Sequence, residues 1–230
     1  MLGMVAALYD YDWEESEKQF RLALAREPVP SRVHWCFGQY CLLPLGRMDE
    51  ALAQQALALR DDPLGVEARI ALAVGLRAAG RDAESNAEFT EMIERDASFW
   101  FPHFGLGMSH ALAGQFDRAR RHAETAYALA PFTAYTTALS AATLARTGDL
   151  ERSQELIGKL LPGDGYGTPL GLAVFHLLMS DVEKAADWTE KAIAQRQAAV
   201  LFFLRTHGQA IRASSRWPGL AALLNQRPGR

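Results

Sequence analysis

The sequence predicts an all-α solenoid built from antiparallel helix pairs. Four glycines recur at an interval of 34 residues, the length of one helix-turn-helix repeat, and they are Gly46, Gly80, Gly114 and Gly148. Apolar residues recur at spacings of three and four on both sides of these glycines. Prolines separate successive pairs, because proline cannot donate the backbone hydrogen bond of a continuing helix. These prolines are Pro28, Pro63 and Pro131.

Each of the four glycines is predicted to end one helix and form a tight turn. Glycine adopts positive φ without a steric penalty, and the acidic residues that follow suit the positive end of the next helix. A small residue always stands five positions after the glycine. These residues are Ala51, Ser85, Ala119 and Ser153. We expect them to be buried where the second helix of each pair approaches its neighbours.

The units resemble the tetratricopeptide repeat. The positions that match its signature are Trp35, Gly107, Phe116, Ala119, Ala126 and Pro131. The first unit, which ends at Pro28, has a truncated first helix, and the sixth has Ser180 where glycine is expected. The resemblance implies a right-handed superhelical solenoid of about six units over residues 1–198, closed by capping helices over residues 199–230.

The end of the chain is similar to the closing segment of a group of bacterial regulators. The similarity is carried by Tyr166, Pro169, Asp181, Trp188, Phe202, Phe203 and Arg212, whereas Trp217 with Pro218 departs from the usual pattern. In those proteins a tetratricopeptide array follows a winged-helix DNA-binding domain, an adenylate cyclase domain or a serine/threonine kinase domain. The similarity implies a regulatory or sensory module, either as part of a larger protein or as a stand-alone relative.

Composition and charge narrow the classes of partner that the chain is expected to bind. Lys and Arg total 24 against 27 Asp and Glu, a net charge of −3, so neither nucleic acid nor an anionic membrane is expected as a partner. The longest apolar run, Leu170 to Met179, is shorter than the roughly 20 residues of a membrane-spanning helix. Cys36 and Cys41 are the two cysteines of the chain and offer no disulfide framework, which favours a cytoplasmic location.

No constellation of residues predicts a reaction centre, a metal or a cofactor. His34, Cys36 and Cys41 diverge around one helix, which favours core packing of free thiols over a metal site. His103 and His110 stand two turns apart on one helix and His122 on the next, so we expect the three histidines to remain separate. The glycine-rich stretch over residues 163–167 lacks the preceding strand of a phosphate loop and indicates a connection between units.

In tetratricopeptide proteins the first helix of each unit lines the concave groove. The resemblance therefore implies that a partner contacts Cys36, Tyr40, Ile70, Val74, Trp100, Phe101, Phe104, Met108 and Tyr135. This groove is mostly apolar and aromatic, so its expected occupant is an amphipathic helix or an apolar peptide. The alternative is that these side chains are core, although one core cannot enclose every ring between Phe99 and Phe104.

The N-terminus offers a second candidate contact. Leu2, Val5, Leu8 and Tyr9 form an apolar edge that no preceding unit covers, whereas solenoid ends usually carry a polar cap. We expect this edge to pack against an upstream domain or a second copy of the chain.

Three functions remain open, in decreasing order of support. The first is a protein-interaction scaffold. The second is a small-molecule sensor that controls an attached effector domain. The third is a helical-repeat enzyme, which the sequence does not favour.

Overall fold

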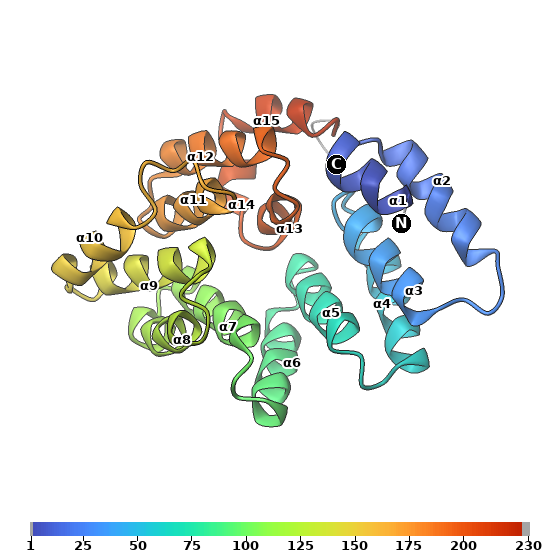
Figure 1. Ribbon diagram of the computed structural model, residues 1–230, viewed down its shortest axis with the longest axis horizontal. Coiled ribbons are helices and arrows are strands. Elements are labelled where there is room, and N and C mark those ends of the chain that lie inside the picture. The colour runs from blue at the N-terminus through green and yellow to red at the C-terminus, as the bar shows by residue number, and fades with distance from the viewer. Residues whose placement is uncertain (1, 227–230) are drawn as a thin grey trace. The chain divides into compact units, whose positions relative to one another are not determined.

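The computed structural model describes residues 2–226, and every regular element in that range is a helix (Figure 1). The predicted all-α fold of antiparallel helix pairs is therefore confirmed. The described residues form two compact units. Unit 1 contains residues 2–88, 201–206 and 218–226, and unit 2 contains residues 89–200 and 207–217.

Unit 1 begins with a short α-helix that continues as a π-helix, and its second pair has the same feature. Its helices are α1 (Leu2–Val5), η1 (Ala6–Asp10), α2 (Trp13–Leu24), α3 (Ser31–Phe37), η2 (Gly38–Leu42), α4 (Met48–Asp61) and α5 (Val66–Ala78). A β-carbon on Gly38 would lie 2.9 Å from the carbonyl oxygen of Ala51, so this glycine allows η2 to approach α4 closely. Helix α6 (Asp82–Arg95) begins in unit 1 and ends in unit 2.

Unit 2 contains three successive helix pairs. These are α7 (Trp100–Leu112) with α8 (Phe116–Leu129), α9 (Ala134–Arg146) with α10 (Leu150–Gly158), and α11 (Thr168–Leu178) with α12 (Val182–Ala194). Helix α9 packs against α7, α8, α10 and α11, which is the stacking expected of a solenoid. The remaining helices are divided between the units. Helix α14 (Gln209–Arg212) belongs to unit 2, whereas most of α13 (Ala199–Thr206) and most of α15 (Trp217–Leu223) belong to unit 1.

The turns between paired helices have the predicted geometry. Gly46, Gly80, Gly114 and Gly148 all have positive φ, between 73° and 93°. Each glycine N–H donates to the carbonyl three residues back, and the next N–H donates to the carbonyl five residues back, at 2.8–3.2 Å. This pair of hydrogen bonds is the Schellman motif. Ser180 forms the same two bonds at φ 64°, so the sixth unit keeps the turn without glycine.

The small residues that follow the turns are buried, as predicted. Ala51, Ser85 and Ala119 are fully buried, and Ser153 is almost so. The Ser153 hydroxyl donates to the carbonyl oxygen of Ala141 at 2.8 Å, which links α10 to α9. A larger side chain at these positions would separate the helices.

The C-terminal segment packs within unit 1. Arg205 of α13 is buried and donates from Nε and Nη2 to the carbonyl oxygen of Pro44, at 3.0 and 2.6 Å. The Trp13 indole N–H donates to the Leu224 carbonyl at 2.8 Å, and Asn225 donates to the Tyr11 carbonyl at 3.3 Å. Unit 1 therefore includes both ends of the described chain.

Within residues 2–226, every helix is too short or too polar to cross a bilayer.

Candidate protein-interaction surface

The start of α7 and the start of α9 together form a cluster of aromatic side chains in unit 2. We name it the aromatic surface, and its members are Phe99, Trp100, Phe101, Phe104 and Tyr135. Neighbouring rings lie 5.4–6.5 Å apart, and the link between α7 and α9 is the pair of Phe104 and Tyr135 at 6.4 Å. Such spacings are those of favourable aromatic pairs.

A buried ring fixes the aromatic surface to the core. Phe89 of α6 is almost fully buried, and its ring centroid lies 6.1 Å from that of Phe101. A β-carbon on Gly105 would lie 2.5 Å from the Phe89 ring, so the ring packs directly on the backbone of α7. The five members of the aromatic surface are all half-buried. Each ring therefore has a fixed position and keeps part of its area exposed to solvent.

Tyr135 adds a polar group to this apolar surface. Burial, with a smaller contribution from Tyr166, raises the pKa of Tyr135 to about 12. The phenol is therefore neutral throughout the physiological range and can both donate and accept a hydrogen bond. Among residues 2–226, none forms a hydrogen bond with its hydroxyl.

The other predicted partner-binding residues have different surroundings. Cys36, Val74 and Met108 are buried, with 3%, 8% and 0% of their surface exposed, so the structure places these three in the core. The expectation that a partner touches them is therefore corrected in favour of core packing. Ile70 and Tyr40 are half-buried.

Tyr40 contacts other parts of unit 1. Its ring lies between those of Trp35 and Phe202, at centroid distances of 5.8 and 5.6 Å. Because Phe202 comes from α13, the chain itself supplies a helix to this face of the N-terminal pairs. The sequence pattern of the repeats contains no signal for this contact.

The prediction that the three histidines remain separate is wrong. His103 Nδ1 lies 3.3 Å from His122 Nδ1, and the His110 ring stacks on that of His122 at a centroid distance of 5.7 Å. His103 and His110 are seven residues apart, close to two helical turns, so they lie on the same face of α7. Because α8 runs antiparallel to α7, His122 of α8 lies opposite them. The sequence does carry a signal for this contact, because Gly114 marks the turn of an antiparallel helix pair that places the three histidines close together.

Two members of the histidine cluster, His103 and His122, have lowered pKa values and favour the neutral form. Burial, followed by the charges of His103 and His110, lowers the pKa of His122 to about 4, and burial also lowers the pKa of His103. His110 Nδ1 pairs with Gln115 Oε1 at 2.9 Å. Within residues 2–226 no group of three or more His, Cys, Asp or Glu side chains has an arrangement that could hold a metal ion.

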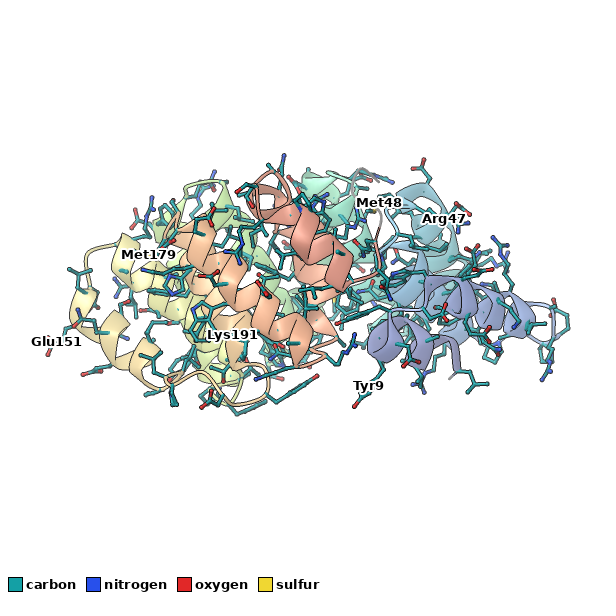
Figure 2. The ribbon with its side chains drawn as sticks, turned by 90° about the horizontal axis from the view of Figure 1, so that it is seen from above. Tyr9, Arg47, Met48, Glu151, Met179 and Lys191 are labelled. Carbon is teal, nitrogen blue, oxygen red and sulfur yellow. The ribbon has the colours of Figure 1, made fainter. Side chains whose placement is uncertain are left out.

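The N-terminal edge remains largely exposed. Leu2, Val5 and Tyr9 have 69%, 54% and 66% of their surface accessible, and Leu8 is half-buried. The Tyr9 side chain projects outward from the helices (Figure 2).

No model of a known protein family matches the chain, and no curated protein matches it in sequence. Solved structures do match. A thermophilic TPR protein of Thermus thermophilus is 18% identical and aligns with 85% of this chain and 99% of its own, with a TM-score of 0.56. A tetratricopeptide repeat protein of Parabacteroides merdae is 15% identical over 96% of this chain and 91% of its own, with a TM-score of 0.54.

Yeast Tom70 is also similar, at 19% identity and a TM-score of 0.58. The match covers 97% of this chain and 50% of Tom70, so this chain spans about half of that protein. The fold is therefore of the tetratricopeptide-repeat type. At these identities the similarity establishes the fold alone.

Proposed function

We propose that this chain is a protein-interaction scaffold that binds a partner through the aromatic surface of unit 2. The observation that carries the proposal is a set of five adjoining rings that are anchored by a buried phenylalanine and are still partly exposed. Rigid aromatic side chains provide large contact areas at little cost in conformational entropy, and they dominate the energetics of protein interfaces. The fold supports the same function, since helical repeats commonly present such surfaces to partners.

The chemistry of the aromatic surface favours an amphipathic helix or an apolar peptide as the partner. Its members are apolar apart from the Tyr135 hydroxyl and the Trp100 indole N–H. An apolar face of the partner would cover Phe101 and Phe104, and a single polar group would meet Tyr135. This mode corresponds to the binding of an amphipathic helix in a groove.

We further propose that the chain is a regulatory or sensory module of a bacterial signalling or transcription-regulating protein and has no catalytic activity of its own. The support is the similarity of its closing segment, from Tyr166 to Arg212, to that of bacterial regulators. Sequencing the gene upstream of the codon for Met1 tests this part. An effector domain encoded in frame would support a module of a larger regulatory protein. A separate, unrelated gene upstream would favour a stand-alone protein.

Site-specific photo-crosslinking tests the scaffold function. p-Benzoylphenylalanine is placed at position 100 or 104 and, as a control, at Leu150, which is 59% exposed on α10. The proposal expects a discrete protein adduct from positions 100 and 104 and none from position 150. Equal labelling from all three positions would contradict it. Absence of any protein adduct, combined with thermal stabilisation by a metabolite, would favour the small-molecule sensor.

A further inference from the structure

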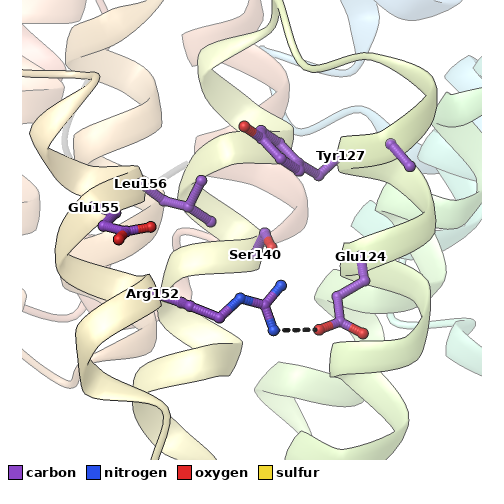
Figure 3. A pocket seen from close by; sticks show the side chains of 7 residues that line it. Glu124, Tyr127, Ser140, Arg152, Glu155 and Leu156 are labelled. Atoms are coloured by element: carbon purple, nitrogen blue, oxygen red, sulfur yellow. Dashed lines mark ion pairs between the residues drawn. The ribbon is translucent and has the colours of Figure 1, made fainter.

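A pocket of about 460 Å³ lies between α8 and α10, with α9 as its floor (Figure 3). All of its lining belongs to unit 2. The lining residues that matter here are Glu124, Tyr127, Ser140, Arg152, Glu155 and Leu156. We propose that this pocket binds an arginine side chain of a partner protein. That the arginine belongs to a partner protein rests on the scaffold function proposed above. That the pocket suits an arginine side chain does not.

The floor of the pocket carries the hydroxyl of Ser140. Ser140 is 2% exposed, and among residues 2–226 none forms a hydrogen bond with its Oγ. The neighbouring hydroxyls on these helices are paired, since Thr143 donates to the Leu139 carbonyl at 3.0 Å and Ser153 donates to the Ala141 carbonyl at 2.8 Å. Because Ser140 lines the pocket, its hydroxyl is available to exchange a hydrogen bond with a ligand there.

One carboxylate of the lining is neutralised and the other is not. Glu124 Oε1 accepts a hydrogen bond from Arg120 Nε at 3.1 Å and lies 3.7 Å from Arg152 Nη1 (Figure 3). Glu155 forms neither a hydrogen bond nor an ion pair within 4.0 Å with any of residues 2–226. The nearby Lys159 ammonium donates to the Tyr127 hydroxyl at 3.0 Å, and this contact, with a minor contribution from the charge of Glu155, raises the pKa of Lys159. The lining therefore presents Glu155 as an acceptor for a cation.

The remaining walls suit a flat cation on an apolar stem. Leu156 and the ring of Tyr127 provide apolar surface on opposite walls. The Lys159 ammonium, which donates to the Tyr127 hydroxyl, also lies 5.6 Å from the centroid of the Tyr127 ring. A guanidinium group stacks on an aromatic ring and directs several N–H donors at once toward a carboxylate and a hydroxyl. An ammonium group would satisfy Glu155 and gain less from the ring, which favours arginine over lysine.

The pocket differs from the aromatic surface in position and chemistry. Its walls belong to the second helices of their pairs, whereas the aromatic surface is built on the first helices α7 and α9. A partner could therefore contact either site without the other. The two sites can be tested separately.

Titration of the full chain with N-acetyl-arginine-N′-methylamide, followed by backbone NMR, tests the proposal. We expect chemical shift changes confined to residues 124–128, 140 and 152–156. The citrulline analogue, which has the same shape without the charge, should bind at least about fivefold more weakly because it loses a charge-assisted hydrogen bond. The corresponding lysine probe should also bind more weakly than the arginine probe.

Matched variants of α10 locate the interaction. Glu155→Gln should weaken binding of the arginine probe about tenfold, as expected for loss of one charge-assisted contact. Glu151 lies one turn earlier on α10 (Figure 2) and does not line the pocket, so Glu151→Gln should change the affinity less than about twofold. Equal binding of the citrulline analogue, or equal affinity of Glu155→Gln and the unaltered chain, would overturn the proposal.

Binding of free arginine without binding of the capped form would identify a metabolite pocket and would also overturn the assignment to a partner protein. Failure of crosslinking at positions 100 and 104 would leave these results unaffected, since the probe requires only the pocket. The failure of one proposal can thus be distinguished from the failure of the other.

Discussion

The first helices of unit 1 and of unit 2 both carry aromatic residues, but different segments pack against their rings. In unit 1, Tyr40 packs between Trp35 and Phe202, and Arg205 is hydrogen-bonded to Pro44 one turn from Phe202. In unit 2, Phe104 contacts Tyr135, whose hydroxyl has no hydrogen-bond partner among residues 2–226. Tyr40 and Phe104 are both half-buried, so the two units differ in which segments contact the rings and not in the burial class of the rings.

The largest expected change in stability is that of Met108→Ala, because Met108 belongs to the core and not to the aromatic surface. Met108 is fully buried, so Met108→Ala should lower the free energy of unfolding by about 3 kcal/mol, because it removes apolar contacts and leaves a cavity. Urea denaturation followed by circular dichroism measures this effect. Met108→Leu conserves volume and should cost less than about 1.5 kcal/mol. A small effect of Met108→Ala would show that this residue is surface after all.

The histidine cluster of unit 2 should make the protein less stable in acid. The pKa of His122 is about 6.5 in an unfolded chain and about 4 in the folded one, so the unfolded state binds more protons between these values. The stability that His122 contributes is therefore complete above pH 6.5 and falls as the pH decreases toward 4, by about 3 kcal/mol in total. His122→Gln should flatten this part of the pH profile of urea denaturation. An unchanged slope would contradict the burial of a neutral imidazole.

Removal of the Arg205 side chain tests the covered face of unit 1. Arg205→Ala deletes two hydrogen bonds from a buried charged group to Pro44, and we expect a loss of about 2 kcal/mol in the free energy of unfolding. Arg60→Ala is a suitable control, since the Arg60 side chain is 69% exposed. Equal unfolding midpoints for the two variants would show that α13 does not stabilise unit 1.

The smallest effect concerns the turn without glycine. Ser180 has φ 64°, which costs a residue with a β-carbon about 1 kcal/mol relative to glycine. Ser180→Gly should therefore raise the free energy of unfolding by up to about 1 kcal/mol, detectable as an increased melting temperature. Gly114→Ser, at φ 73°, is the reverse change and should lower it by a similar amount.

The sequence predicted the elements whose structure depends on local backbone chemistry. The positive φ of Gly46 and the burial of Ser153 follow from the repeat pattern, because a tight turn and a close helix approach each permit few residue types. Phe104 and Met108 are four residues apart and share one face of α7, yet Met108 is core and Phe104 is half-buried. That distinction depends on neighbouring helices, as does the meeting of His103 with His122. The position of Ser140 on the floor of the pocket has no signal in the sequence either, because it depends on how α8 and α10 pack beside α9.

The most direct test of the account measures the affinity of the crosslinked partner for matched variants in the two units. Phe104→Ala should weaken binding at least about tenfold, as truncation at an interface hot spot does, while retaining the helical circular dichroism spectrum. Tyr40→Ala should lower the stability of unit 1 and leave the affinity within about twofold. Unchanged affinity of Phe104→Ala, or a greater loss of affinity for Tyr40→Ala, would contradict the assignment of partner binding to the aromatic surface.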